Sequence, residues 1–380
     1  MSTPTTDPIY LDHNASTPLL PEALEAMLPY LRNEHGNPSS GHIWGRRARD
    51  AVEKARGQVA RLIGCAPWEL VFTGGGTEAN NLAILGTLEA RTDGRRAVVL
   101  SAVEHAAVQS PCERLAKRGY TVRTLPVDRT GMVTEEGWRA AIIDDVALVS
   151  VMHANNEVGT VQPIRALADR AHAVGARIHC DAAQSVGKTS VRVDELDVDL
   201  LSLAAHKFYG PKGVGALYIR QGVPVEPLVV GAGHERGLRP GTENVAGIVG
   251  MGVAAEVVQK KLTDEMARLE GLRAALLEGL TRAIPGLTAL GHPVQRLCNT
   301  LNVSFPGVTG SSVLRHAPII AASTGSACHG EEASHVLAVM GLPAELTRGA
   351  VRLSLGRLTG PQEVERAVAA LVEGWRQARS

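Results

Sequence analysis

The sequence predicts an α/β fold, with a large domain built on a mainly parallel sheet and a smaller α+β domain after it. Two observations support this prediction. Between residues 70 and 220, short β-branched runs alternate with amphipathic stretches, as in a parallel sheet with helices on its faces. Several of these runs are apolar almost throughout, which is typical of strands covered on both faces.

The elements of the large domain follow from these patterns in order. Two helices are expected first, over 21–32 and 45–63, separated by a polar, turn-rich run at 36–41. The predicted strands span 97–101, 121–126, 147–152, 177–180, 200–203 and 214–219. The predicted helices between them span 106–118, 134–143 and 164–174.

A long helical pattern runs from 246 to 283, with one interruption expected near Lys261. It leads into a region where the spacing of apolar residues is different. Strands are expected there at 300–305, 319–322 and 351–355, with helices after the first strand, near 333–340 and from Pro361. We therefore predict an N-terminal segment, 1–15, that joins the small domain, a large domain over 16–255 and a small domain over 256–380.

Composition and charge exclude several kinds of partner. The chain has 39 Lys plus Arg and 39 Asp plus Glu, so no net field draws it to nucleic acid or to an anionic membrane. No run approaches the roughly 18 apolar residues that span a bilayer. The polar start, residues 1–8, lacks the features of a secretory signal, so a cytoplasmic location is expected.

The five cysteines are widely scattered, and none forms a Cys-x-x-Cys pair, so neither a metal site nor a disulfide framework is predicted. This usage fits a reducing compartment. We expect four of the five to be small buried hydrophobes and single out Cys328.

A glycine cluster at 73–81 enters a predicted helix. Glycines let the backbone approach an anion, and the exposed amides of a helix start favour phosphate. The cluster lacks the lysine of a Walker loop and the spacing of a dinucleotide fingerprint. On its own it fits either a phosphate site or a plain turn.

Asp181 and Lys207 each follow a predicted strand, where ligands of α/β sheets collect. Asp181 is suited to pair with a protonated pyridine nitrogen, or to cap a helix. Lys207 lies between an apolar strand and a Gly-Pro turn, where desolvation makes an amine nucleophilic, although a single loop lysine is usually solvated. The combination with the glycine cluster indicates an enzyme that uses pyridoxal phosphate, held by Lys207 as a Schiff base.

Further motifs run through nearly the whole chain in a fixed order, at 10–18, 36–40, 73–81, 103–105, 153–157, 178–184, 205–213, 239–244, 325–328 and 351–357. Their series resembles the class V, fold-type I pyridoxal-phosphate enzymes, specifically the cysteine desulfurases and selenocysteine lyases. The resemblance implies a mainly parallel seven-stranded sheet in the large domain. It also implies a small domain that carries a catalytic cysteine and a carboxylate-binding arginine.

The resemblance implies a role for each matching residue around the cofactor ring. Lys207 is the Schiff-base lysine and Asp181 the partner of the ring nitrogen. Gln184 is expected to hydrogen-bond the phenolic oxygen, with Asn156 close to ring and substrate. His105 is expected to stack on the ring face and to move protons.

The phosphate is expected on the amides of Gly76 and Thr77, assisted by His206. The resemblance also implies that Thr242 reaches this phosphate from a second subunit, so a homodimer is expected. Ala204 departs from the pattern, because many family members carry a serine there whose hydroxyl contacts the phosphate. One hydrogen bond, worth roughly 0.5 to 1.5 kcal/mol net, is then absent, and cofactor binding should survive its loss.

Arg352 matches the arginine that grips the substrate carboxylate, a role suited to its two-pronged donor pattern. A surface salt bridge is the alternative, and the apolar strand around Arg352 disfavours it. Asn14 and Asn156 are expected near the substrate. Cys328 lies among small and charged residues, where a thiol is able to ionise.

The implied reaction converts L-cysteine to L-alanine and leaves a persulfide on Cys328. The sulfur then passes to an acceptor protein or a small thiol, which links the family to sulfur transfer and iron–sulfur cluster assembly. The segment from Cys328 to His335 is shorter than in the long-loop desulfurases. Details at 206–211, 327–329 and 342–346 look more like selenocysteine lyases, so the choice between cysteine and selenocysteine stays open.

Two other readings remain. An aminotransferase or another lyase would need Lys207 and Asp181 but not Cys328. A non-catalytic sulfur-assembly scaffold would be expected to have lost Lys207, Arg352 or Cys328, and all three are present.

Overall fold

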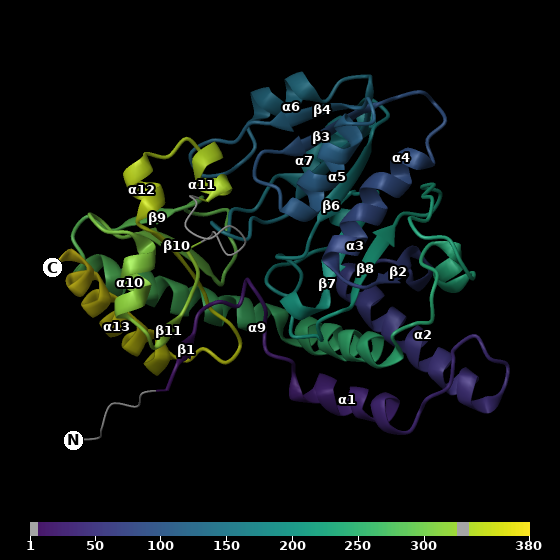
Figure 1. The fold of residues 1–380 in the computed structure, drawn as a ribbon, viewed down its shortest axis with the longest axis horizontal. Helices are drawn as coiled ribbons and strands as arrows, with labels where there is room; N and C mark the ends of the chain where they lie inside the picture. The colour runs from purple at the N-terminus through teal and green to yellow at the C-terminus, as the bar shows by residue number, and fades with distance from the viewer. Residues whose placement is uncertain (1–6, 325–333) are drawn as a thin grey trace.

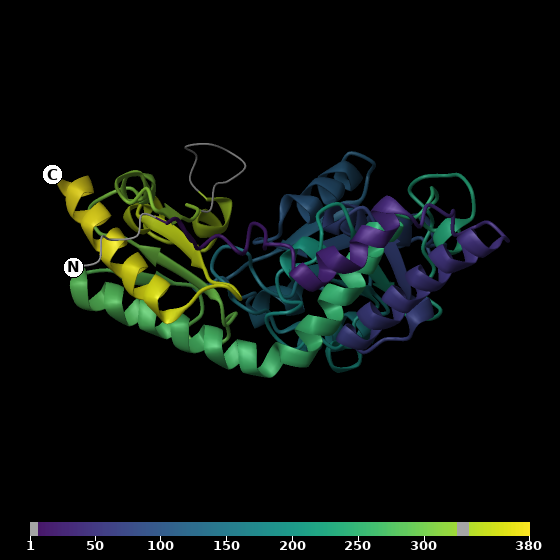
Figure 2. The same ribbon diagram turned by 90° about the horizontal axis from the view of Figure 1, so that it is seen from below.

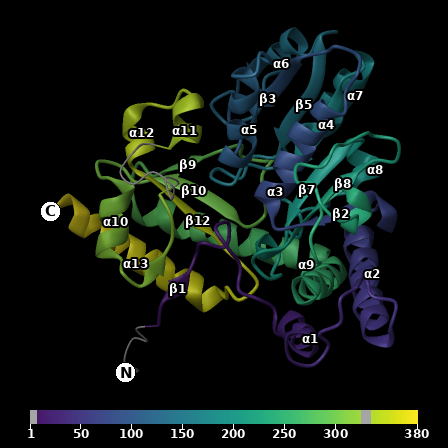
Figure 3. The same cartoon turned by 45° about the vertical axis from the view of Figure 1, so that its right-hand side comes forward.

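The centre of the fold is a seven-stranded sheet with the strand order β2-β8-β7-β6-β5-β3-β4. The computed structural model describes residues 7–324 and 334–380. The strands are β2 (Leu70–Thr73), β3 (Ala97–Ser101), β4 (Thr121–Leu125), β5 (Val146–Met152), β6 (Arg177–Asp181), β7 (Leu200–Ala204) and β8 (Gly215–Ile219). Only β8 in this sheet runs against its neighbours, so the other six strands point the same way (Figure 3). The predicted mainly parallel seven-stranded sheet is confirmed.

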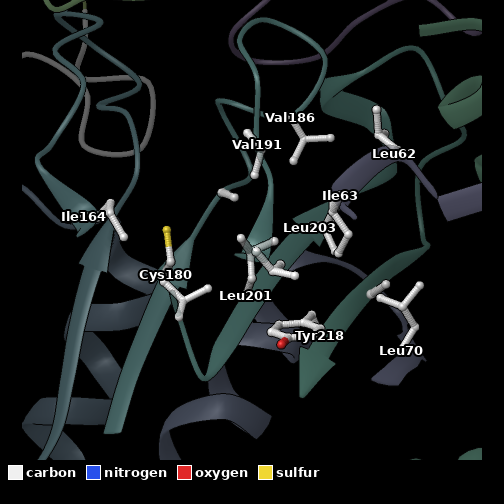
Figure 4. Close-up of a cluster of buried hydrophobic side chains, with 14 of the residues drawn as sticks. Leu62, Ile63, Leu70, Ile164, Cys180, Val186, Val191, Leu201, Leu203 and Tyr218 are labelled. Carbon is white, nitrogen blue, oxygen red and sulfur yellow. The ribbon is translucent and has the colours of Figure 1, made fainter. Parts of the chain in front are cut away.

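Helices cover both faces of this sheet. One face packs on α2 (Ile43–Ile63), α7 (Ile164–Ala173) and the first part of α9 (Val245–Ala283), and α1 (Pro21–Arg32) lies against α9. The other face packs on α5 (Ala106–Ala116) and on a helical run of α3 (Gly76–Asn81), a π turn (Leu82–Gly86) and α4 (Thr87–Glu89). Figure 4 shows Leu201 and Leu203 of β7 near Ile63 of α2. Successive side chains of a strand point to opposite faces of the sheet. Since helices cover both faces, the side chains on each face are buried, and the strands are apolar throughout.

The C-terminal part has a three-stranded antiparallel sheet in the order β12-β10-β9. Its strands are β9 (Thr288–Leu290), β10 (Thr300–Ser304) and β12 (Ala350–Ser354), and its helices are α10 (Gly310–His316), α11 (His335–Val339), α12 (Ala344–Arg348) and α13 (Pro361–Arg379). The N-terminal strand β1 (Ile9–Tyr10) pairs in parallel with β11 (Ile320–Ala321) of this part. Ile9 and Leu11 are buried in the same hydrophobic core, so the first described residues pack with the C-terminal part.

The helix α9 is continuous over 39 residues, so the interruption expected near Lys261 was wrong. The polar residues around Lys261 lie between two cores rather than at a break: Met251 packs in the large core and Leu276 in the small one. Figures 1 and 2 show α9 extending beneath both parts. The division that we propose between the parts falls within α9. In residues 7–324 and 334–380, no helix has the length and apolarity needed to cross a membrane.

A buried ion pair fastens the loop that joins β8 to α9. Arg56 of α2 donates two hydrogen bonds to the Glu235 carboxylate, at 2.7 and 2.8 Å, and Glu235 also accepts from the Phe72 amide at 2.7 Å. The side chains of Arg56 and Glu235 are only 7% and 3% exposed. Glu235 also adopts a left-handed backbone (φ 48°), a conformation that a non-glycine residue keeps only when its surroundings hold it there.

We expect Glu235→Gln to lower the free energy of unfolding by about 3 kcal/mol, because it removes the buried counter-charge of Arg56 and leaves only the ion pair with the exposed Glu53. Chemical denaturation monitored by circular dichroism would measure this loss. The matched control is Asp145→Asn, which breaks an exposed pair with Arg123 that has similar hydrogen bonds, and should cost less than about 1 kcal/mol. Equal losses in the two variants would contradict the argument.

Candidate active site

The residues predicted to bind the cofactor ring converge at one edge of the seven-stranded sheet. Asp181 ends β6, Lys207 follows β7, His105 follows β3 and Asn156 follows β5. Six of the strands point the same way, so their carboxyl ends meet at this edge, where ligands of α/β sheets bind. The glycine loop that begins at Gly74 follows β2 at the same edge.

The Asp181 carboxylate is buried and held from two sides. Its Oδ2 accepts from Asn80 Nδ2 at 2.7 Å, and its Oδ1 accepts from the Ala183 amide at 3.0 Å. These two hydrogen bonds fix the direction of the carboxylate. The motif that contains Asn80 was recognised in the sequence, but its contact with Asp181 was not foreseen, since the two residues are far apart in the chain.

The Lys207 amine rests on the backbone of the N-terminal segment. Its Nζ donates to the carbonyl oxygens of Asn14 at 2.7 Å and Ala15 at 3.0 Å. Burial, followed by repulsion from Arg352, lowers the pKa of Lys207 to about 8, although Asp181 and Asp12 act in the opposite direction. Roughly a tenth of this amine is therefore neutral, and hence nucleophilic, near pH 7, far more than for a lysine with an ordinary pKa.

The glycine loop borders a cavity of about 620 Å³. The predicted phosphate ligands Gly76, Thr77 and His206 all line it, together with Ser16, Gly75 and Lys212. A side chain on Gly215 would lie 2.7 Å from the carbonyl carbon of Gly75, so the close approach of these two segments requires glycine. Burial, with repulsion from Lys207, lowers the pKa of His206 to about 4, which leaves its ring neutral.

Asn14 links the two parts of the molecule. Its Nδ2 donates to Thr300 Oγ1 at 2.9 Å and to the Asn156 carbonyl at 3.1 Å. Its Oδ1 accepts from Asn299 Nδ2 and Lys188 Nζ, each at 3.2 Å, and its backbone carbonyl accepts from Gln184 Nε2 at 2.9 Å. The predicted substrate residue Asn14 thus uses all its side-chain polar atoms within the protein.

Arg352 of β12 brings a buried guanidinium to the same region. Its Nη2 lies 2.7 Å from Asp12 Oδ1, and its Nη1 donates to the Asn156 carbonyl at 3.2 Å. Its Nε is buried and has no hydrogen-bond partner among the described residues. This free donor fits the predicted grip on a carboxylate. Sequence reasoning assigned no role to Asp12.

Three predicted residues are not joined to this network. His105 caps α5, where its Nδ1 accepts from the Ala107 amide at 3.1 Å, and its side chain is exposed. Thr242 is exposed and does not line the cavity of its own chain. Cys328 lies outside the described residues.

The fold and this edge define an α/β enzyme with a ligand site where the two parts meet. The chain belongs to the aminotransferase class-V family, which matches residues 9–367. It is 46% identical over 360 residues to the cysteine desulfurase IscS of Dictyoglomus turgidum, covering 94% of this chain and 91% of that protein.

Other relatives agree. Cysteine desulfurase 2 of Trichormus variabilis is 46% identical over 364 residues, covering 95% of this chain and 91% of that protein. A solved structure described as a NifS-like protein superposes with a TM-score of 0.91 at 37% identity, covering 96% of this chain and 98% of that one. The family and the fold expected from the motifs are confirmed.

Proposed function

We propose that this chain is a pyridoxal-phosphate-dependent cysteine desulfurase that converts L-cysteine to L-alanine. Sulfur remains as a persulfide on Cys328, so one substrate and one enzyme thiol give one alanine and one persulfide. The observation that carries the proposal is the convergence of Lys207, Asp181 and Arg352 at one edge of the sheet, in a chain whose relatives are named cysteine desulfurases.

The residues at this edge fit the cofactor. The cavity beside Gly76 and Thr77 offers backbone amides to a phosphate, and the fixed Asp181 carboxylate suits a protonated ring nitrogen. The Lys207 amine is available for covalent attachment. When bound, pyridoxal phosphate supplies an electron-withdrawing ring that accepts the electron pair released at the substrate's Cα.

The chain's own residues provide the remaining steps. Arg352 orients the substrate by its carboxylate, using the free Nε beside Asp12. Lys207 removes the proton from Cα, for which a pKa of about 8 is well matched near neutral pH. The Cys328 thiolate attacks the substrate's sulfur, so the C–S bond breaks as the S–S bond forms, and protonation at Cβ completes alanine.

A homodimer in the cytoplasm is part of the proposal. Thr242 is exposed on its own chain, as expected of a residue that reaches a neighbour's phosphate. The same loop exposes Leu228, Val229 and Val230 by 41, 66 and 88%, an apolar run that a second subunit would cover. Analytical ultracentrifugation of the active enzyme is expected to show a dimer. An active monomer would show that the proposed homodimer is wrong.

The proposal is tested by giving the cofactor-loaded protein L-cysteine or L-selenocysteine, with a reductant. Alanine is measured together with sulfide or selenide, and equal amounts of alanine and sulfide are expected from cysteine. Release of selenide without any release of sulfide would instead indicate a selenocysteine lyase. If neither substrate gives alanine, the proposed function is wrong.

We expect Arg352→Lys to raise KM for cysteine by about 10²-fold with a smaller change in kcat. Lysine keeps the charge but loses the planar fork that binds a carboxylate through two hydrogen bonds. Steady-state kinetics of alanine formation separate the two constants. The control is Arg348→Lys on α12, an exposed arginine whose replacement should leave both constants unchanged. An unchanged KM in Arg352→Lys would contradict the carboxylate role.

A further inference from the structure

Lys188, in the turn after β6, is a buried lysine that sequence reasoning left without a role. Its side chain is almost inaccessible, with the residue 5% exposed. Its Nζ donates to Gln184 Oε1 at 2.8 Å and to Asn14 Oδ1 at 3.2 Å. Within the described part of the chain, no carboxylate forms an ion pair with Lys188.

A buried amine without a counter-charge is costly, because its charged form loses the solvation of water. Burial, followed by repulsion from Lys207, lowers the pKa of Lys188 to about 7. The titratable groups that face Lys188 are Lys207, Arg352, Cys298, His13 and His206. An apolar side chain would fill this space without the cost, so the amine calls for an explanation through its contacts.

Those contacts determine which way the Gln184 amide points. Both the ammonium and the neutral amine of Lys188 have N–H donors for the two amide groups that face it, so the Gln184 amide atom that faces Lys188 is the oxygen. The Nε2 of Gln184 then faces away from Lys188 and donates to the Asn14 carbonyl at 2.9 Å. The same carbonyl accepts from Lys207 Nζ at 2.7 Å, so the amide N–H of Gln184 lies beside the amine of Lys207.

Asn14 holds Lys188 in turn. Its Nδ2 donates to the Asn156 carbonyl, which can only accept, so its Oδ1 faces Lys188. The Lys188 amine, which is protonated below its pKa, is thereby fixed against the oxygen of the same Gln184 amide whose nitrogen is the donor. A donor polarised by a neighbouring cation is a stronger hydrogen-bond donor in a low-dielectric site.

We propose that Lys188 is a positioning residue that locks the Gln184 amide with its N–H toward the cofactor's phenolic oxygen and favours the ionised form of that oxygen. This inference rests on the proposed function, because it assigns Gln184 to the phenolic oxygen. It adds a residue that acts through Gln184 and touches neither substrate nor cofactor.

The test measures how the visible absorption of the bound cofactor changes with pH in the substrate-free enzyme. In Lys188→Met, which has a similar length but no donor, the midpoint of this change should rise by about one pH unit, because the donor that orients and polarises Gln184 is lost, together with the positive charge that it carries below its pKa. Gln184→Ala should raise the midpoint as well. The double variant should show no further rise beyond Gln184→Ala, because Lys188 acts through Gln184.

The exposed Lys54→Met on α2 is the matched control and should leave the midpoint unchanged. A midpoint in Lys188→Met equal to that of the wild type, even with reduced activity, would overturn the inference, as would additive shifts in the double variant. If Lys188→Met does not fold, Lys188→Gln, which removes the charge and shortens the side chain but keeps a polar group, should also give an upward shift. A wild-type protein that shows no cofactor absorption would overturn the proposed function instead.

Discussion

Replacing Lys207 with alanine is expected to lower the rate of alanine formation from cysteine by about 10³-fold or more. The change removes the amine that we propose holds the cofactor and takes the Cα proton, and acid–base catalysis alone contributes about 10² to 10⁴-fold. The loss should appear in kcat, since Arg352 and the glycine-loop cavity that we propose for the phosphate are unchanged. Single-turnover assays with added pyridoxal phosphate would measure it.

Borohydride reduction followed by peptide mapping locates the covalent attachment. The trapped cofactor is expected on Lys207 in the wild type and on no peptide of Lys207→Ala. Lys188 is the natural comparison, because it too is buried and its pKa is lowered to about 7. Attachment at Lys188, or nowhere, would overturn the assignment, whereas Lys54→Ala on the surface of α2 should retain both label and activity.

The large sheet could be predicted because its strands carry an unambiguous signal. Strands such as β5 and β7 are buried on both faces, so every residue is apolar or small, and their predicted ends lie within a residue of those observed. Short elements gave no such signal. No strand was predicted for β2 or β9, with four and three residues, since runs of that length have no readable periodicity.

The interruption expected in α9 fails for a different reason. Polar residues near Lys261 break the apolar stripe because the helix passes between two cores there, and not because the backbone changes. The local sequence contains neither glycine nor proline, and Lys260 pairs with Glu256 one turn earlier. In the sequence, the polar stretch where one helix passes from the first core to the second thus looked like the end of a helix.

The site residues likewise divide into those that could be predicted from the sequence and those that could not. Asp181 and Lys207 could be predicted because they lie at or shortly after the ends of apolar strands, and the direction of a parallel sheet brings such positions together. Asp12 and Lys188 could not, because their importance comes from contacts with residues far along the chain. A single lysine in a turn is usually solvated, and no local sequence pattern indicates that Lys188 is buried. The role of Cys328 stays a prediction, because it lies outside the described residues.

The four described cysteines are poor candidates for the nucleophile, which supports the prediction for Cys328. Burial raises the pKa of Cys65 and Cys112 to about 12, and that of Cys298 to about 11. The same cause raises the pKa of Cys180 well above its usual value. Since the thiolate is the reactive form, none of these four is suited to attack a substrate's sulfur at neutral pH.

We therefore expect Cys328→Ala to lower alanine formation from cysteine by at least about 10²-fold while the cofactor absorption stays intact, because the variant loses the sulfur acceptor and keeps the ring site. Mass spectrometry of the wild type after one turnover should find one added sulfur on Cys328. Cys65→Ala is the matched control, because Cys65 is the most accessible of the four described thiols, and it should keep its activity within about twofold. Undiminished alanine formation in Cys328→Ala would exclude the persulfide route and favour an enzyme that needs only Lys207 and Asp181.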